Sequence, residues 1–215
     1  MGLVVALFAF SFFFFTTNFK PIYFNEQPLY KNAHFAPKFG DILTYEYRIL
    51  NETGNVSFLF KKMILETKNF TTIYANCTKV VANDLNISTC INDDGTDNES
   101  NQSLASPFFF FFAPWMLALN ENFSWKSQTV SSINNEILEN FSVSYIERTI
   151  FLGRDAYVVD VVNKGIFGDF EKKLWIDVKN RFVLKEEGKN YTFTLIRAWF
   201  SLNPNRGGGN PSKTG

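Results

Sequence analysis

The chain has 215 residues, which is the size of one ordinary domain. It carries 21 Lys plus Arg and 21 Asp plus Glu, so its formal net charge is zero. This balance argues against nucleic acid as a partner, because phosphate binding draws on clustered and uncompensated cations. A single histidine, His34, and two cysteines leave too few ligands for a structural zinc site. We expect a metal-free protein without a cofactor, with a large core built from the 46% of hydrophobic residues.

Residues 1–17 form the first predicted element. From Leu3 to Phe15, all positions except Ser11 are apolar. This length is typical of the core of a secretory signal peptide and is shorter than the roughly 20 residues of a spanning helix. No basic residue precedes the run, and no small-x-small cleavage site follows it. The segment is therefore predicted to be a hydrophobic helix that acts as a signal peptide or, if retained, as a membrane anchor.

Acceptor sequences for N-glycosylation are unusually dense in this chain. The composition alone predicts about three Asn-x-Ser/Thr matches. The sequence has ten, at Asn51, Asn55, Asn69, Asn76, Asn86, Asn98, Asn101, Asn122, Asn140 and Asn190. An occupied acceptor must point to solvent, because a sugar does not fit in a packed core. This density predicts an exported, glycosylated protein.

The two cysteines agree with export. Cys77 and Cys90 lie thirteen positions apart. In an oxidising compartment this spacing favours one local disulfide. The alternative is a pair of unpaired buried thiols.

Residues 18–39 contain three prolines and no clear period, which predicts an extended lead-in. From Gly40 onward the dominant period is two, as where Tyr45, Tyr47 and Ile49 alternate with polar residues. Such alternation is typical of a half-buried strand. The predicted strands cover residues 44–49, 56–65, 69–82, 84–90, 123–131, 141–151, 155–163, 170–178, 181–187 and 190–200.

Short spacing between turn residues predicts an antiparallel meander. We expect an all-β, mainly antiparallel domain over residues 40–202, either a curved half-barrel or a sandwich, with little helix. One or two helical turns are predicted over residues 133–140. Residues 203–215 are rich in Gly, Pro and Asn and are predicted to be a disordered tail.

Acidic residues cluster in two places, and neither cluster has the residue spacing of a known catalytic motif. Residues 91–106 include several carboxylates, but their spacing does not match a calcium loop of the EF-hand type, so a solvated surface loop is predicted. The adjacent Glu186 and Glu187 are interpreted as a solvated turn. No nucleotide-binding, nucleophile-elbow or metalloprotease motif occurs.

Residues 107–119, PFFFFFAPWMLAL, are too short to span a bilayer and are bounded by proline. Two interpretations stay open: a segment that plugs the core of a β-structure, or an apolar surface for a lipid, the membrane or a neighbouring subunit. The second makes this segment the candidate apolar pocket. Its predicted lining residues are Phe108, Phe109, Phe110, Phe111, Phe112 and Trp115.

One stretch resembles a known family. In residues 150–200, the pattern GRDAYVVDVV, then LWID, then NRFVLKEE is similar to that of periplasmic lipoprotein carriers and related sigma-factor regulators, the LolA/RseB-like group. The resemblance implies a curved half-barrel whose concave face holds acyl chains. The composition as a whole is more similar to that of glycosylated surface proteins of thermophilic archaea.

These observations predict a non-catalytic, N-glycosylated protein, secreted or held on the extracellular face of the membrane, that binds an apolar ligand or lipid in a sheet-lined pocket. One alternative is a structural subunit of a surface filament or envelope layer, self-assembled by strand addition through residues 18–39. A secreted hydrolase is the weaker alternative, because a Ser-His-Asp or Cys-His arrangement would have to use His34 in the lead-in.

Overall fold

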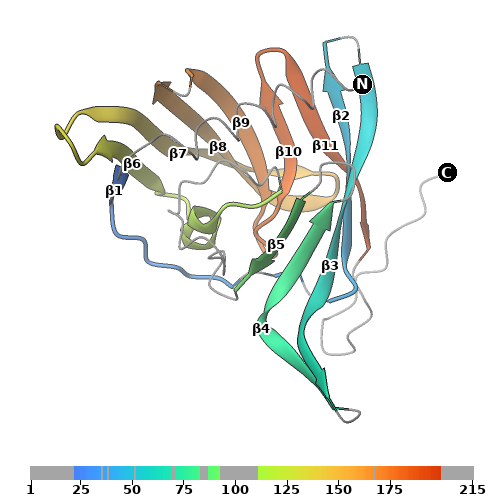
Figure 1. Ribbon diagram of the computed structural model, residues 1–215. Coiled ribbons are helices and arrows are strands. Elements are labelled where there is room, and N and C mark those ends of the chain that lie inside the picture. Colours follow the sequence, from blue (N-terminus) through green and yellow to red (C-terminus); the bar gives the residue numbers. More distant parts are fainter. Residues whose placement is uncertain are drawn as a thin grey trace.

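The computed structural model describes residues 22–34, 36–37, 39–50, 52–68, 71–82, 87–92, 111–166 and 168–199. In this part of the chain, eleven strands form one sheet in the order β1-β6-β7-β8-β9-β10-β11-β2-β3-β4-β5 (Figure 1). The strands are β1 (Ile22–Glu26), β2 (Ile42–Ile49), β3 (Glu52–Lys68), β4 (Thr71–Ala82), β5 (Ile87–Ile91), β6 (Ser124–Ser131), β7 (Ile137–Phe151), β8 (Arg154–Gly165), β9 (Phe170–Asp177), β10 (Val183–Gly188) and β11 (Tyr191–Trp199).

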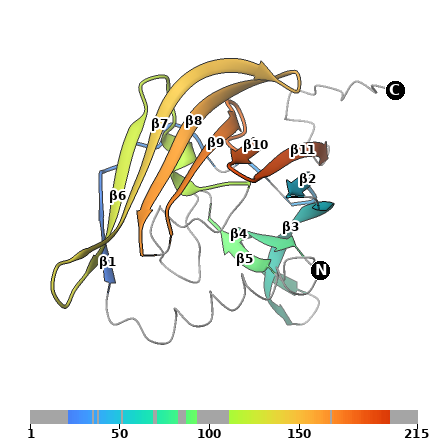
Figure 2. The ribbon, with the colours of Figure 1, turned by 90° about the horizontal axis from the view of Figure 1, so that it is seen from above.

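The predicted all-β, antiparallel fold is confirmed. Each neighbouring pair of strands in the sheet runs antiparallel. The strands lie in one sheet rather than in the two packed sheets of a sandwich. Seen from above, the sheet curves strongly (Figure 2). Among the described residues no pairing joins β1 to β5, so the sheet is open and not a closed barrel.

Residues 1–17, the predicted signal peptide or anchor, and 203–215, the predicted tail, lie outside the described residues. Within the described ranges, no helix has the length and apolar character needed to cross a bilayer. Part of the predicted lead-in belongs to the sheet, because Ile22–Glu26 pairs with β6. The indole Nε1 of Trp125 then donates to the Gln27 carbonyl over 2.9 Å. The lead-in is thereby tied to the domain.

Residues 111–119, here called the insert, lie inside the curve of the sheet (Figure 2). The insert contains the short 3₁₀ helix η2 (Pro114–Ala118), and each of its residues is buried. The backbone N–H of Val183 donates to the Phe111 carbonyl over 2.7 Å, which attaches the insert to β10. The Phe111 ring lies 4.6 Å from that of Phe58 and 5.5 Å from that of Phe60, between ring centroids. The described part of the phenylalanine-rich stretch is therefore packed core.

The helical turns predicted over residues 133–140 are wrong. Residues 132–135 form the turn of a hairpin, and β7 begins at Ile137. Asn135 has a φ of 56°, a left-handed conformation that Asn tolerates better than most residues. The backbone N–H of Glu136 donates to the Asn134 side chain, and that of Ser131 donates to the Glu136 carbonyl. The polar Asn134–Asn135 pair thus makes a turn and not a helix.

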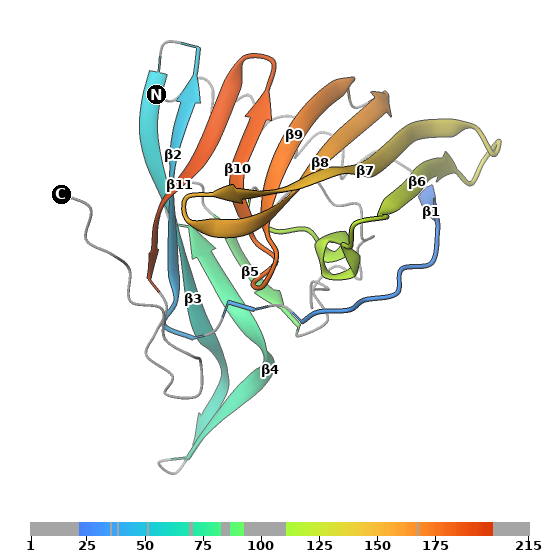
Figure 3. The ribbon, with the colours of Figure 1, turned by 180° about the vertical axis from the view of Figure 1, so that it is seen from behind.

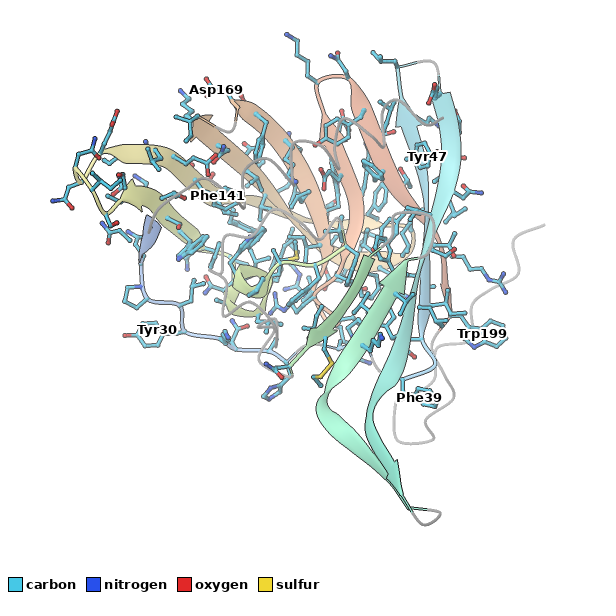
Figure 4. All side chains as sticks on the ribbon, in the orientation of Figure 1. Tyr30, Phe39, Tyr47, Phe141, Asp169 and Trp199 are labelled. Carbon is cyan, nitrogen blue, oxygen red and sulfur yellow. A yellow bond between two sulfur atoms is a disulfide. The ribbon has the colours of Figure 1, made fainter. Side chains whose placement is uncertain are left out.

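The predicted disulfide between Cys77 and Cys90 is confirmed. It joins β4 to the edge strand β5, where the two Cα atoms are 5.7 Å apart. The sulfur–sulfur bond is the yellow stick beside β5 (Figure 4). The bond holds the last strand of the sheet to its single neighbour.

Candidate ligand-binding face

The concave face of the sheet is the face that curves around the insert. Its upper end, as drawn in Figure 1, is where β2 ends and β9 begins; its lower end is the β9–β10 turn, residues 178–182. Strand pairing places rows of side chains across this face. One row runs from Tyr47 through Phe193, Glu186 and Leu174 to Val159.

The insert fills the lower part of the concave face. Of the six residues predicted to line an apolar pocket, Phe111, Phe112 and Trp115 are each at most 2% exposed. The Trp115 ring stacks on that of Phe123 at 6.0 Å. Residues 108–110 lie outside the described residues. The packing of the three described side chains is that of a core, and their contact with a ligand stays a prediction.

The upper end carries an upper aromatic band, which we define as Tyr47, Phe141, Phe170, Tyr191 and Phe193. All but Phe193 are only half-buried, in contrast to the insert. The Phe193 ring lies 6.1 Å from that of Tyr47 and 5.7 Å from that of Tyr191. Tyr47 and Phe141 come from opposite sides of the curve (Figure 4). The band therefore surrounds the upper end from several strands.

Two glycines shape this band. Gly54 on β3 pairs with Tyr47, and Gly188 on β10 pairs with Tyr191. A Cβ on either glycine would collide with the ring of the paired tyrosine. Each ring therefore lies against the backbone of the neighbouring strand, at a place where only glycine leaves room for it.

A buried carboxylate lies beside the band. Glu186 is 2% exposed, and its Oε1 accepts from Lys172 Nζ over 3.0 Å and from the Tyr191 hydroxyl over 2.7 Å. The interpretation of Glu186 as part of a solvated turn is wrong, because β10 turns this side chain onto the concave face while Glu187 stays exposed. A buried charge needs such a partner, since desolvation would otherwise be very costly.

The same carboxylate affects two tyrosines. The Tyr45 hydroxyl donates to the Val183 carbonyl over 2.6 Å, across β11. Burial, followed by the charges of Glu186 and Asp177, raises the pKa of Tyr45 well above its ordinary value. Burial, followed by Glu186, also raises the pKa of Tyr191. Both hydroxyls therefore remain hydrogen-bond donors at neutral pH.

The lower end is held by Asp177, part of the LWID motif. Its Oδ1 accepts from the backbone N–H groups of Lys179 and Asn180, and its Oδ2 pairs with Arg154 Nη1 at 3.0 Å. Arg181 follows in the same turn and is buried against Tyr157. Arg181 was not among the predicted site residues; the signal in the sequence is its place in a tight turn directly after Asn180.

The N-glycosylation acceptors whose side chains are described, here called sequons, are accessible to solvent. Asn55, Asn122, Asn140 and Asn190 are all exposed. Asn76 lies on β4, and nothing is described of its side chain. The other acceptors lie outside the described residues, at Asn51, Asn69, Asn86, Asn98 and Asn101.

Nothing in the described ranges forms a metal centre: no three His, Cys, Asp or Glu side chains gather in a way that could hold an ion. His34 is exposed in the lead-in. The groups that the structure does bring together on the concave face are aromatic rings, the hydroxyls of Tyr45 and Tyr191, and the ion pair of Lys172 with the buried Glu186. Such a face can hold an apolar molecule and orient a polar group on it.

The fold and face define an open, curved antiparallel sheet with an apolar insert. No family model matches the chain, and no curated protein matches it. Among solved structures, it is similar to a protein with a YmcC-like fold from Bacteroides fragilis, which is provisionally described as exported. The identity is 10%, the match covers 78% of this chain and 99% of the other, and the TM-score is 0.35. The resemblance to lipoprotein carriers and an archaeal source stay predictions.

Proposed function

We propose that this protein is an exported, N-glycosylated, non-catalytic surface protein that binds an apolar ligand or lipid against the upper aromatic band. The observation that carries the proposal is the half-burial of Tyr47, Phe141, Phe170 and Tyr191 on a face whose lower part is filled by the insert. The disulfide and the exposed sequons support export.

The band favours an apolar ligand for a physical reason. Covering partly exposed aromatic surface is worth about 25 cal/mol per Å² of area removed from water. Rings held against glycine backbone lose little conformational freedom on binding, which preserves that gain. Lys172, Glu186 and Tyr191 add a polar group at the edge of the apolar surface. This combination is typical of sites for small, mostly apolar molecules.

Titration with a dansyl-labelled fatty acid tests the proposal. We expect saturable binding by the full chain, and about tenfold weaker binding by Phe141→Ala, because one aromatic contact is lost. Phe151→Ala is the matched control. Phe151 lies on the same strand, but its ring packs against that of Trp175, 6.0 Å away between centroids, on the outer face. Figure 3 shows this face, with the hairpin that joins the end of β7 to the start of β8.

The control should bind the probe as the unchanged protein does. Absence of binding by the unchanged protein contradicts the proposed function. An equal loss in Phe141→Ala and Phe151→Ala contradicts the assignment to the upper aromatic band.

Intact-mass measurement of protein from its source tests export and glycosylation. We expect the mass to fall after treatment with peptide N-glycosidase, and the N-terminus to show whether residues 1–17 are removed or retained. Unmodified asparagine at the exposed positions 55, 122, 140 and 190 contradicts this part of the proposal.

Strand addition and hydrolase activity stay as alternatives without a supporting observation. Ile22–Glu26, part of the proposed donor segment, already pairs with β6 of its own chain. The favoured function is therefore ligand binding on the concave face.

A further inference from the structure

A buried arginine with a largely unpaired guanidinium lies at the lower end of the concave face. Arg181 is 6% exposed, and its Nη2 donates to Asn32 Oδ1 over 3.1 Å. Its Nε and Nη1 are buried and find no hydrogen-bond acceptor among the described residues. These two nitrogens carry three N–H groups, so most of the hydrogen-bonding capacity of this side chain is unused.

The nearest carboxylate is already engaged. Asp177 holds the backbone of its turn with Oδ1 and pairs with Arg154 through Oδ2. In the described part of the chain, no carboxylate forms an ion pair with Arg181. The Tyr157 ring lies 5.1 Å from Arg181 Cζ and attracts the cation. The Tyr157 hydroxyl also interacts with the guanidinium, but Nε and Nη1 are left without an acceptor among the described residues. Burial lowers the pKa of Arg181, and the opposing effects of Tyr157 and of the Asp177 charge do not fully offset it.

The surroundings hold Arg181 in place. Its φ is 57°, a left-handed conformation that is rare for a side chain of this size, and the hydrogen bonds to Asp177 fix the turn. Asn32 is fixed as well, because its Nδ2 donates to the Leu119 carbonyl over 3.1 Å and its backbone N–H donates to the Leu117 carbonyl over 2.8 Å. The donors are therefore positioned before any ligand arrives.

We propose that Arg181, positioned by Asn32 and Tyr157, binds an oxyanion of a ligand, a carboxylate or a phosphate group. The planar guanidinium matches both groups, and an anion there would neutralise the buried charge. This anion site lies at the end of the face opposite the upper aromatic band, and its existence does not depend on apolar binding there.

Denaturant unfolding of the full chain in sodium phosphate tests the site, with sodium chloride of equal ionic strength as the reference. A ligand that binds only the folded state raises the folding equilibrium constant by a factor of one plus the ratio of its concentration to Kd. We expect about a tenfold rise when phosphate is at about ten times its Kd. No rise beyond that in chloride contradicts the proposal.

Two substitutions at the site and one control locate the effect. Arg181→Met should abolish the phosphate response, and Arg181→Lys should keep part of it, because an ammonium retains the charge without the planar donors. Arg48→Met is the control, since Arg48 is an exposed arginine paired with Glu46. It should keep the full response. A response that persists in Arg181→Met contradicts the proposal.

The dansyl-labelled fatty acid distinguishes the sources of the anion. If Arg181→Met weakens its binding, the anion is the head group of the apolar ligand; if binding is unchanged, the anion is a separate soluble molecule. Both results keep the site, provided that phosphate stabilises the unchanged chain.

Discussion

The two ends of the concave face are built differently. The lower part is filled by the insert, whose Phe111 and Trp115 are almost completely enclosed by other side chains of the chain. The upper end has rings of similar size, such as Tyr47 and Phe141, that keep part of their surface exposed. The difference teaches that aromatic content alone does not identify a binding surface. What matters is whether the chain itself covers the rings.

The polar groups also differ between the two ends of the face. At the upper end, Lys172, Glu186 and Tyr191 satisfy one another. At the lower end, Asp177 and Arg154 pair, but Arg181 keeps unused donors. We therefore expect substitutions in the insert to affect folding, and substitutions in the upper aromatic band to affect ligand binding.

Trp115→Ala should give the largest loss of stability. Removing a buried aromatic side chain from the insert leaves a cavity, and such changes cost about 3–5 kcal/mol in the free energy of unfolding. Urea unfolding measures the loss. Tyr30→Ala is the control because Tyr30 is 89% exposed, and it should change stability by less than about 0.5 kcal/mol. Equal effects of the two substitutions contradict the description of the insert as core.

Removing the disulfide should cost about 3 kcal/mol, because the unfolded chain gains freedom when a loop of this length is opened. Thermal unfolding of the variant Cys77→Ala/Cys90→Ala and of the unchanged protein, both without reductant, measures this loss. The bond lies on β4 and β5, and Ile91 of β5 belongs to the same core cluster as the insert. Affinity for the dansyl-labelled fatty acid should stay the same. A large change in affinity would mean that the two ends are coupled.

Lys172→Met should cost about 3 kcal/mol, because it leaves the Glu186 carboxylate buried without its cation. Lys173→Met is the matched control: Lys173 is the next residue on β9 and is exposed on the opposite face. Guanidinium unfolding compares the two variants. If Lys173→Met is equally costly, the loss comes from the strand and not from the buried ion pair.

Tyr191→Phe should cost about 1 kcal/mol through the lost hydrogen bond to Glu186. It should also change the dependence of stability on pH. The folded state raises the pKa of Tyr191 above the unfolded value of about 10, so the folded state holds this proton more tightly. Its contribution is full below about pH 10 and is lost as the pH rises further.

Urea midpoints between about pH 8 and about pH 11 check this prediction. The unchanged protein should lose stability more steeply than Tyr191→Phe across that range. Tyr30→Phe, which alters an exposed tyrosine, should follow the unchanged protein. Parallel curves for all three proteins would contradict the role of Tyr191.

Much of the strand pattern could be predicted because burial alternates along each strand. Tyr45 and Tyr47 were predicted to share a face, and both lie on the concave side of β2. The spacing of apolar residues gave the wrong prediction, a helix, at residues 133–140. There Ile133 and Ile137 lie four positions apart, as on a helix, but the Asn pair between them forms a turn.

The polar part of the candidate site could not be predicted in the same way. Glu186 was predicted to be solvated because Glu187 follows it in the sequence. Its burial is possible because Lys172, on another strand, donates a hydrogen bond to its carboxylate. Arg181 is bonded to Asn32, which is 149 positions away. Pairings of this kind arise where the curved sheet brings distant segments together, and they leave no local period in the sequence.

The pairing of β1 has a consequence for how the chain reaches its native state. β1 precedes every other described strand, yet its partner is β6, and Ile22 meets Ser131. Contacts between such distant positions form slowly, since a long loop must close first. During synthesis or translocation, β1 therefore stays unpaired until β6 has emerged from the ribosome or the translocation pore. β1 is therefore synthesised before the other described strands but joins the sheet late. Until it does, the edge of β6 is unpaired, and we expect misassembly to occur mainly at this edge.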